Sequence, residues 1–124
     1  MPDITTRQDI ELLVDKFYGQ VIEDDIIGEF FTGVVKLDWT VHIPIMYNFW
    51  ETILLDNIIY KGNPMMKHIQ LSQKKTLAPH HFERWLELWE KTIRMSFQGP
   101  KAEEAISRAK QIASLMKFKV ENVS

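Results

Sequence analysis

The sequence contains no cysteine among its 124 residues. This absence excludes a disulfide framework, a thiolate zinc site, an iron–sulfur cluster and a cysteine nucleophile. A strong charge of either sign is missing as well, because 15 Lys and Arg residues are balanced by 17 Asp and Glu residues. The formal net charge of −2 therefore provides no electrostatic footprint for nucleic acid.

Long apolar runs are also missing. No stretch approaches the roughly 20 apolar residues that a membrane-spanning helix requires. Residues 1–6 lack the basic and apolar regions of a signal peptide. We therefore expect a cytoplasmic protein without a membrane span, in which residues 1–124 form one domain large enough to build its own core.

The sequence carries no strand signals, since it has neither an alternating Val, Ile and Thr run nor an Asn-Gly or Asp-Gly hairpin turn. Apolar residues instead recur at helical spacing, which predicts an all-α fold. Four long helices are expected, from Thr6 to about Glu23, from about Trp39 to Asp56, from Pro79 to just before Gly99, and from Lys101 onward. The first opens on a capping-box pattern of Thr6 and Asp9, and Asp24 and Asp25 are expected to cap a shorter helix that follows it. The predicted apolar faces comprise Ile10, Leu13, Val14, Phe17, Tyr18 and Val21 on the first long helix, Trp39, His42, Ile45, Met46, Phe49, Trp50, Ile53 and Leu54 on the second, and Ala102, Ala105, Ile106, Ala109, Ile112, Ala113 and Met116 on the last. Pro44 lies two residues after His42, and this predicts an irregular or late-starting first turn in the second of these helices.

A short apolar stretch between the helices presents a histidine. Residues 63–71 read Asn-Pro-Met-Met-Lys-His-Ile-Gln-Leu, in which Asn63 can cap a single helical turn and Pro64 suits its first position. His68 then falls at the end of that turn among apolar residues. An axial haem ligand requires a histidine presented in this way, but a hydrogen-bonded core histidine would fit the stretch as well.

Several short motifs occur in a fixed order along the chain. They are Phe17-Tyr18, Trp39-x-x-His42, Asn48-Phe49-Trp50, Asn63-Pro64-Met65-x-x-His68, Phe82-x-x-Trp85-Leu86, Thr92, Phe97-x-Gly99 and Arg108-Ala109-x-x-Ile112-Ala113. As an ordered set spanning nearly the whole chain, they resemble the group III truncated haemoglobins. The resemblance implies a single truncated globin domain, folded as a globin-like two-over-two helical sandwich that binds haem b.

The resemblance also implies roles for individual residues. His68 becomes the proximal iron ligand, and Tyr18, Trp85 and His42 become the residues that stabilise a bound ligand. The implied haem pocket comprises Tyr18, His42, Met46, Trp50, Met65, His68 and Trp85. No catalytic residue is firmly predicted, although His42 is placed where a distal acid or base would act.

The two donors expected above the iron bear on function. Dioxygen bound to haem iron carries partial negative charge, and hydrogen bonds to charged partners contribute about 1.5–3 kcal/mol each. Donors on Tyr18 and Trp85 together would slow dioxygen loss by roughly two to four decades. Such retention suits detoxification of nitric oxide or peroxide better than oxygen delivery, with electrons from an unidentified reductase. We expect a monomer or weak homodimer whose ligand is dioxygen or another small diatomic molecule.

Two other interpretations of the sequence remain open at this level. A cofactor-free helical module that binds a partner protein would explain the aromatic stripes as core and the histidines as satisfied core groups. His80 and His81 form the densest histidine cluster, but neighbouring residues on a helix point about 100° apart and chelate one metal poorly. The presence or absence of a haem absorption band distinguishes the haem protein from the cofactor-free module.

Overall fold

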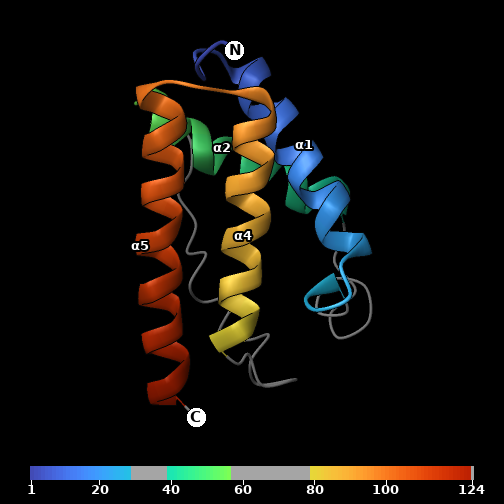
Figure 1. The fold of residues 1–124 in the computed structure, drawn as a ribbon, viewed down its shortest axis with the longest axis vertical. Coiled ribbons are helices and arrows are strands. Elements are labelled where there is room, and N and C mark those ends of the chain that lie inside the picture. Colours follow the sequence, from blue (N-terminus) through green and yellow to red (C-terminus); the bar gives the residue numbers. More distant parts are fainter. Residues whose placement is uncertain (29–38, 57–78, 124) are drawn as a thin grey trace.

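The structure is a computed structural model that describes residues 1–28, 39–56 and 79–123, with side chains as far as residue 118. These residues form four helices, α1 (Arg7–Glu23), α2 (Trp39–Leu55), α4 (Pro79–Ser96) and α5 (Pro100–Val123), as drawn in Figure 1. No strand occurs within the described ranges. None of the helices described is both long enough and apolar enough to cross a membrane.

The four helices pack as two pairs. Helix α1 packs on α2, and α4 packs on α5, while α1 also contacts α4 and α2 contacts α5. In Figure 1, α4 and α5 run side by side and are joined at one end by a short connection. The all-α, two-over-two arrangement predicted from the sequence is confirmed.

Helix α1 begins at a capping box, as Thr6 and Asp9 predict. The Thr6 hydroxyl accepts a hydrogen bond from the Asp9 N–H (3.2 Å), and the Asp9 carboxylate accepts one from the Thr6 N–H (3.1 Å). Burial acts to raise the pKa of Asp9, but hydrogen bonds to its carboxylate from Thr5 and Thr6 outweigh burial and hold the pKa below its ordinary value. The predicted apolar face is entirely buried and comprises Ile10, Leu13, Val14, Phe17, Tyr18 and Val21.

Asp24 ends α1 and starts the next turn. Its carboxylate accepts hydrogen bonds from the N–H groups of Ile26 and Ile27, both at 3.0 Å. The other carboxylate oxygen accepts a bond from Arg84 Nε on α4, at 2.8 Å. The prediction that Asp24 caps a following turn is confirmed as far as Gly28, and the rest of the short helix expected there lies outside the described residues.

The second long helix begins where it was predicted, at Trp39, and includes Pro44. Of the two alternatives predicted for its first turn, irregular or late-starting, the late start is therefore wrong. The first four N–H groups of any helix have no partner within it, so a proline at the sixth position removes only one internal bond, its own to the carbonyl of Thr40. The helix can therefore start before the proline, with a first turn joined less firmly to the remainder.

The N-terminal segment fastens the connection between α4 and α5. The Asp3 carboxylate accepts hydrogen bonds from the N–H groups of Lys101 (2.9 Å) and Ala102 (2.8 Å), and the Pro2 carbonyl accepts one from Gln98 (2.9 Å). Gly99 has a φ of 141°, and a Cβ there would lie 2.7 Å from Asp3 Cγ. The glycine is thus required both by the turn and by the close approach of Asp3.

Aromatic rings form the centre of the core. Trp89 is 1% exposed, stacks on Trp50 with ring centroids 4.5 Å apart, and meets the edge of Phe17 at 5.0 Å. Its indole N–H donates to the carbonyl of Ala105 on α5 at 3.1 Å. One side chain of α4 therefore contacts α1, α2 and α5, which fixes how the two helix pairs sit on each other.

Candidate functional site

Two of the predicted pocket residues meet across α1 and α2. The hydroxyl of Tyr18 lies 3.3 Å from Nε2 of His42, and the two rings meet edge to face with centroids 5.3 Å apart. Tyr18 lies on the buried face of α1, and His42 lies in the first turn of α2, before Pro44. Residues 24 positions apart in sequence thus form a hydrogen-bonded pair at the end of the α1–α2 interface.

The protonation of this pair sets what it can offer a ligand. Burial raises the pKa of the Tyr18 hydroxyl far above its ordinary value of 10, so the phenol stays protonated at neutral pH. If His42 carries its proton on Nε2, the imidazole donates to the Tyr18 oxygen and the phenol O–H can point at a ligand. In the other tautomer the imidazole accepts from the phenol. The hydrogen bond between Tyr18 and His42 can therefore run in either direction, depending on the tautomer of His42.

Trp85 lies on α4 beside the same part of α1. Its ring meets the edge of Phe17, the residue before Tyr18, at a centroid distance of 5.9 Å. It is also parallel to Trp89, with centroids 6.3 Å apart. Trp85 is half-buried and packs at the border of the core rather than within it, which leaves part of its indole available to a bound group.

The two pocket residues predicted on the body of α2 differ in how deeply they are buried. Trp50 is 4% exposed and stacks against Trp89, so its ring belongs to the core. Met46 is half-buried and packs against the edge of that core. The contact of either side chain with a haem stays a prediction.

Several apolar side chains of α2, α4 and α5 are only half covered. The apolar faces predicted for α1 and α5 are almost completely buried, whereas the face of α2 is not. Ile45, which was predicted on that face, is exposed. The half-buried apolar residues that border the core include Met46, Phe49, Ile53, Trp85, Leu86 and Ile112. They supply the apolar contact surface that a flat hydrophobic ligand needs.

Met65 and His68 lie outside the described residues, as does the capped turn that starts at Asn63. The roles of Met65 and His68 therefore stay predictions. Among the described residues no group of three or more His, Asp or Glu side chains could hold a metal ion. His80 is exposed on the first turn of α4, with its ring 4.1 Å from that of His81.

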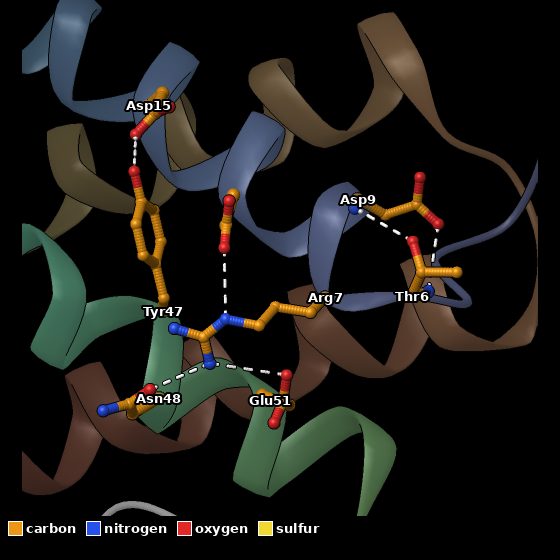
Figure 2. Close-up of polar contacts among 8 residues, drawn as sticks. Thr6, Arg7, Asp9, Asp15, Tyr47, Asn48 and Glu51 are labelled. Carbon is orange, nitrogen blue, oxygen red and sulfur yellow. Dashed lines mark hydrogen bonds and ion pairs between the residues drawn. The ribbon is translucent and has the colours of Figure 1, made fainter.

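Sequence reasoning missed a polar network between α1 and α2, which Figure 2 shows. Arg7 Nη1 donates to Asn48 Oδ1 at 2.9 Å and lies 3.4 Å from Glu51 Oε1. Farther along the same two helices, the Tyr47 hydroxyl donates to the Asp15 carboxylate. The sequence does contain a signal for this network, because Glu51 is the single Asp, Glu, Lys or Arg residue between positions 39 and 55. A lone carboxylate on an apolar helix requires a partner from another element.

Three comparisons with known proteins agree with one another. The family model of the bacterial-like globins matches residues 3–119. The group 3 truncated haemoglobin of Campylobacter jejuni subsp. jejuni is 29% identical over 111 residues, which cover 87% of this chain and 85% of that protein. The crystal structure of the group III truncated haemoglobin from Campylobacter jejuni superposes with a TM-score of 0.83 at 27% identity, covering 97% of this chain and 95% of that one. The resemblance found in the sequence is thereby confirmed.

Proposed function

Because this chain belongs to the bacterial-like globin family, we propose that its residues 1–124 act as a single domain that retains dioxygen for chemistry rather than delivering it. Membership of the family implies a haem cofactor and the binding of small diatomic ligands. It does not favour a cofactor-free interaction module. The finer steps, namely haem b as the cofactor, His68 as its proximal ligand and the reaction served, are our proposal.

The described residues suit a haem. A porphyrin needs an apolar surface for its faces and a few polar groups near the metal. The half-buried apolar side chains of α2, α4 and α5 provide such a surface. Tyr18, His42 and Trp85 provide an O–H, an imidazole and an N–H at its border. A haem b would be held between these groups and an imidazole from the segment that follows α2, for which His68 is the candidate.

The pair Tyr18 and His42 carries this proposal. A haem supplies an iron whose sixth position accepts a diatomic ligand. The raised pKa of Tyr18 keeps its hydroxyl protonated near neutral pH, so the phenol has an O–H to donate and can accept a bond from His42 at the same time. His42 orients that phenol, and Trp85 adds an indole N–H from α4. Two donors that act on one partly charged ligand slow its release, which supports retention.

Retention favours reactions in which the held ligand is consumed. The conversion of nitric oxide and dioxygen to nitrate takes up one electron, so this reaction needs a reductase between turnovers. Reduction of peroxide is the alternative in the same class. It would require a proton donor and acceptor near the ligand, a role that the imidazole of His42 could fill. In both cases the site residues act by hydrogen bonding and proton transfer at the Tyr18 hydroxyl and at His42 Nε2.

The dissociation rate of dioxygen tests the donor role of Tyr18. The Tyr18→Phe variant removes one hydroxyl and keeps the ring that packs on Phe17. We expect dioxygen to leave about tenfold to a hundredfold faster, as measured by stopped-flow displacement with carbon monoxide. Ser96→Ala is the matched control, since it removes a hydroxyl from α4 that accepts a bond from Lys16. An unchanged rate in Tyr18→Phe would refute the donor role.

The reaction itself is tested by mixing the dioxygen complex with nitric oxide. Stoichiometric appearance of nitrate, faster than dioxygen release, is the result that the proposal expects. If the complex instead loses dioxygen intact and then binds nitric oxide at the rate of that loss, the retention role is wrong and simple reversible oxygen binding is favoured.

A further inference from the structure

Three polar contacts cross the interface between α1 and α2 in regular order. The first joins Arg7 to Asn48 and Glu51, the second joins Asp15 to Tyr47, and the third joins Tyr18 to His42. As the position on α1 increases from 7 to 18, the position on α2 decreases from 51 to 42. The contacts therefore form one antiparallel series, of which the pair Tyr18 and His42 is the last member.

The last member depends on the earlier ones because His42 and Tyr47 lie on the same helix. Helix α2 runs from Trp39 to Leu55, with Pro44 inside it. The position of His42 on α1 is thus tied to where the body of α2 is held. The nearest polar contact in the series that holds this body is the one between Tyr47 and Asp15.

The hydrogen bond between Tyr47 and Asp15 is suited to holding α2 on α1. Partial burial, together with the hydrogen bond to Asp15, raises the pKa of Tyr47 to about 12, so its hydroxyl remains a donor at neutral pH. The Arg7 guanidinium lies over the Tyr47 ring, 5.8 Å from its centroid. Asp15 is three residues before Tyr18, which places it about one helical turn away on α1. The contact therefore acts on the helix segment that carries Tyr18.

We propose that Tyr47 and Asp15 are positioning residues for the distal site: their hydrogen bond fixes the register of α2 on α1 and thereby sets the contact between His42 and Tyr18. This inference rests on the proposed function, because its consequence is a change in ligand retention. Neither residue need touch the ligand.

The test compares single and double variants of the haem-loaded protein. Tyr47→Phe removes only the hydroxyl, and we expect it to change the dioxygen dissociation rate by about threefold or more, in the same direction as His42→Leu. In a His42→Leu background the same change should have no further effect, because the group it positions is gone. The control Ser96→Ala removes a hydrogen bond between α1 and α4, and we expect it to leave the rate unchanged.

Two further measurements separate positioning from a general loss of packing. Asp15→Asn keeps an acceptor oxygen and should behave like the wild type, whereas Asp15→Ala should behave like Tyr47→Phe. The C–O stretching band of the carbon monoxide complex, which senses nearby donors, should shift in Tyr47→Phe and in Asp15→Ala but not in Asp15→Asn or Ser96→Ala.

The outcomes are distinguishable. If Tyr18→Phe alters the dissociation rate but Tyr47→Phe alters neither the rate nor the C–O band, the proposed function stands and the positioning role is wrong. If the effects of Tyr47→Phe and His42→Leu are additive, the positioning role is also wrong. A wild-type protein that takes up no haem overturns the proposed function, and this inference falls with it.

Discussion

Replacing Asp24 by Asn tests how the structure joins α1 to α4. The Asp24 side chain is 5% exposed and its partner Arg84 is 34% exposed, with 2.8 Å between Oδ1 and Nε. An asparagine oxygen can still accept the bonds from Ile26 and Ile27, but its amide nitrogen would face the guanidinium as a second donor. The variant therefore removes the ion pair and keeps the capped turn.

The magnitude follows from the partial exposure of the pair. Hydrogen bonds to charged groups contribute about 1.5–3 kcal/mol, and solvent screening at the Arg84 end reduces this. We expect the free energy of unfolding at about pH 7 to fall by about 1–2 kcal/mol. This corresponds to a decrease in Tm of about 4–8 °C for a domain of this size.

The pH dependence provides a sharper test. Burial acts to raise the pKa of Asp24, but the hydrogen bonds from Ile27, Arg84 and Ile26 outweigh it and hold the pKa below its ordinary value of 3.8. The ionised carboxylate therefore contributes stability that is fully present above pH 3.8. This contribution is lost as the pH falls through the lower pKa of the folded state. Urea unfolding followed by circular dichroism measures the difference in the free energy of unfolding between wild type and Asp24→Asn. This difference should be smaller at about pH 3 than at about pH 7.

Glu103→Gln is the control for this experiment. It breaks an ion pair with Arg94 in which both side chains are more than half exposed, so we expect almost no change in the free energy of unfolding. If Asp24→Asn is no more destabilising than Glu103→Gln, or if its effect is the same at both ends of the pH range, the reasoning about the Asp24–Arg84 link is wrong.

Three other substitutions test the connection between α4 and α5 at Gly99, a position inside α1, and the core. Gly99→Ala should lower the free energy of unfolding by about 2–4 kcal/mol in urea titration, because its φ is 141° and the new Cβ would displace Asp3 from the start of α5. Gly19→Ala places its new Cβ where no atom lies within 4 Å, so it should instead raise the free energy of unfolding by about 0.5–1 kcal/mol. Equal effects of the two alanine substitutions would show that neither the φ of Gly99 nor its contact with Asp3 requires a glycine. Trp89→Phe should lower the free energy of unfolding by about 1–3 kcal/mol, because it loses the hydrogen bond to Ala105 and part of the contact with Trp50. A thermal unfolding midpoint equal to that of the wild type would show that the stack of Trp89 on Trp50 is not central to the core.

Most of the helical framework could be predicted from the sequence, because it rests on local patterns. The Thr6 and Asp9 capping box, the buried face of α1 and the stop at Gly99 were all readable from spacing and residue type. The start of α2 near Trp39 was predicted as well, but the late first turn expected from Pro44 was wrong, since whether a helix tolerates a proline near its beginning depends on the rest of its packing.

The candidate site could be predicted only in part. That Tyr18 and His42 belong to one pocket was implied by the family resemblance, but their hydrogen bond was not predicted, and periodicity alone gave each residue a face but no partner. The network around Arg7 and Tyr47 involves polar residues outside the apolar stripes, and contacts between residues 32 to 44 positions apart leave no local signal. Only the isolated charge of Glu51 indicated that such a partner was needed.

We propose that this chain holds haem iron through His68, and absorption spectroscopy is the decisive experiment. Purified protein titrated with haemin should develop a Soret band with one equivalent bound. His68→Ala should lose that band or bind haemin far more weakly, with partial recovery on addition of imidazole. His80→Ala, at an exposed position on α4, should bind as the wild type does. A wild-type protein without a Soret band, or a His68→Ala variant with the spectrum and affinity of the wild type, would contradict the account.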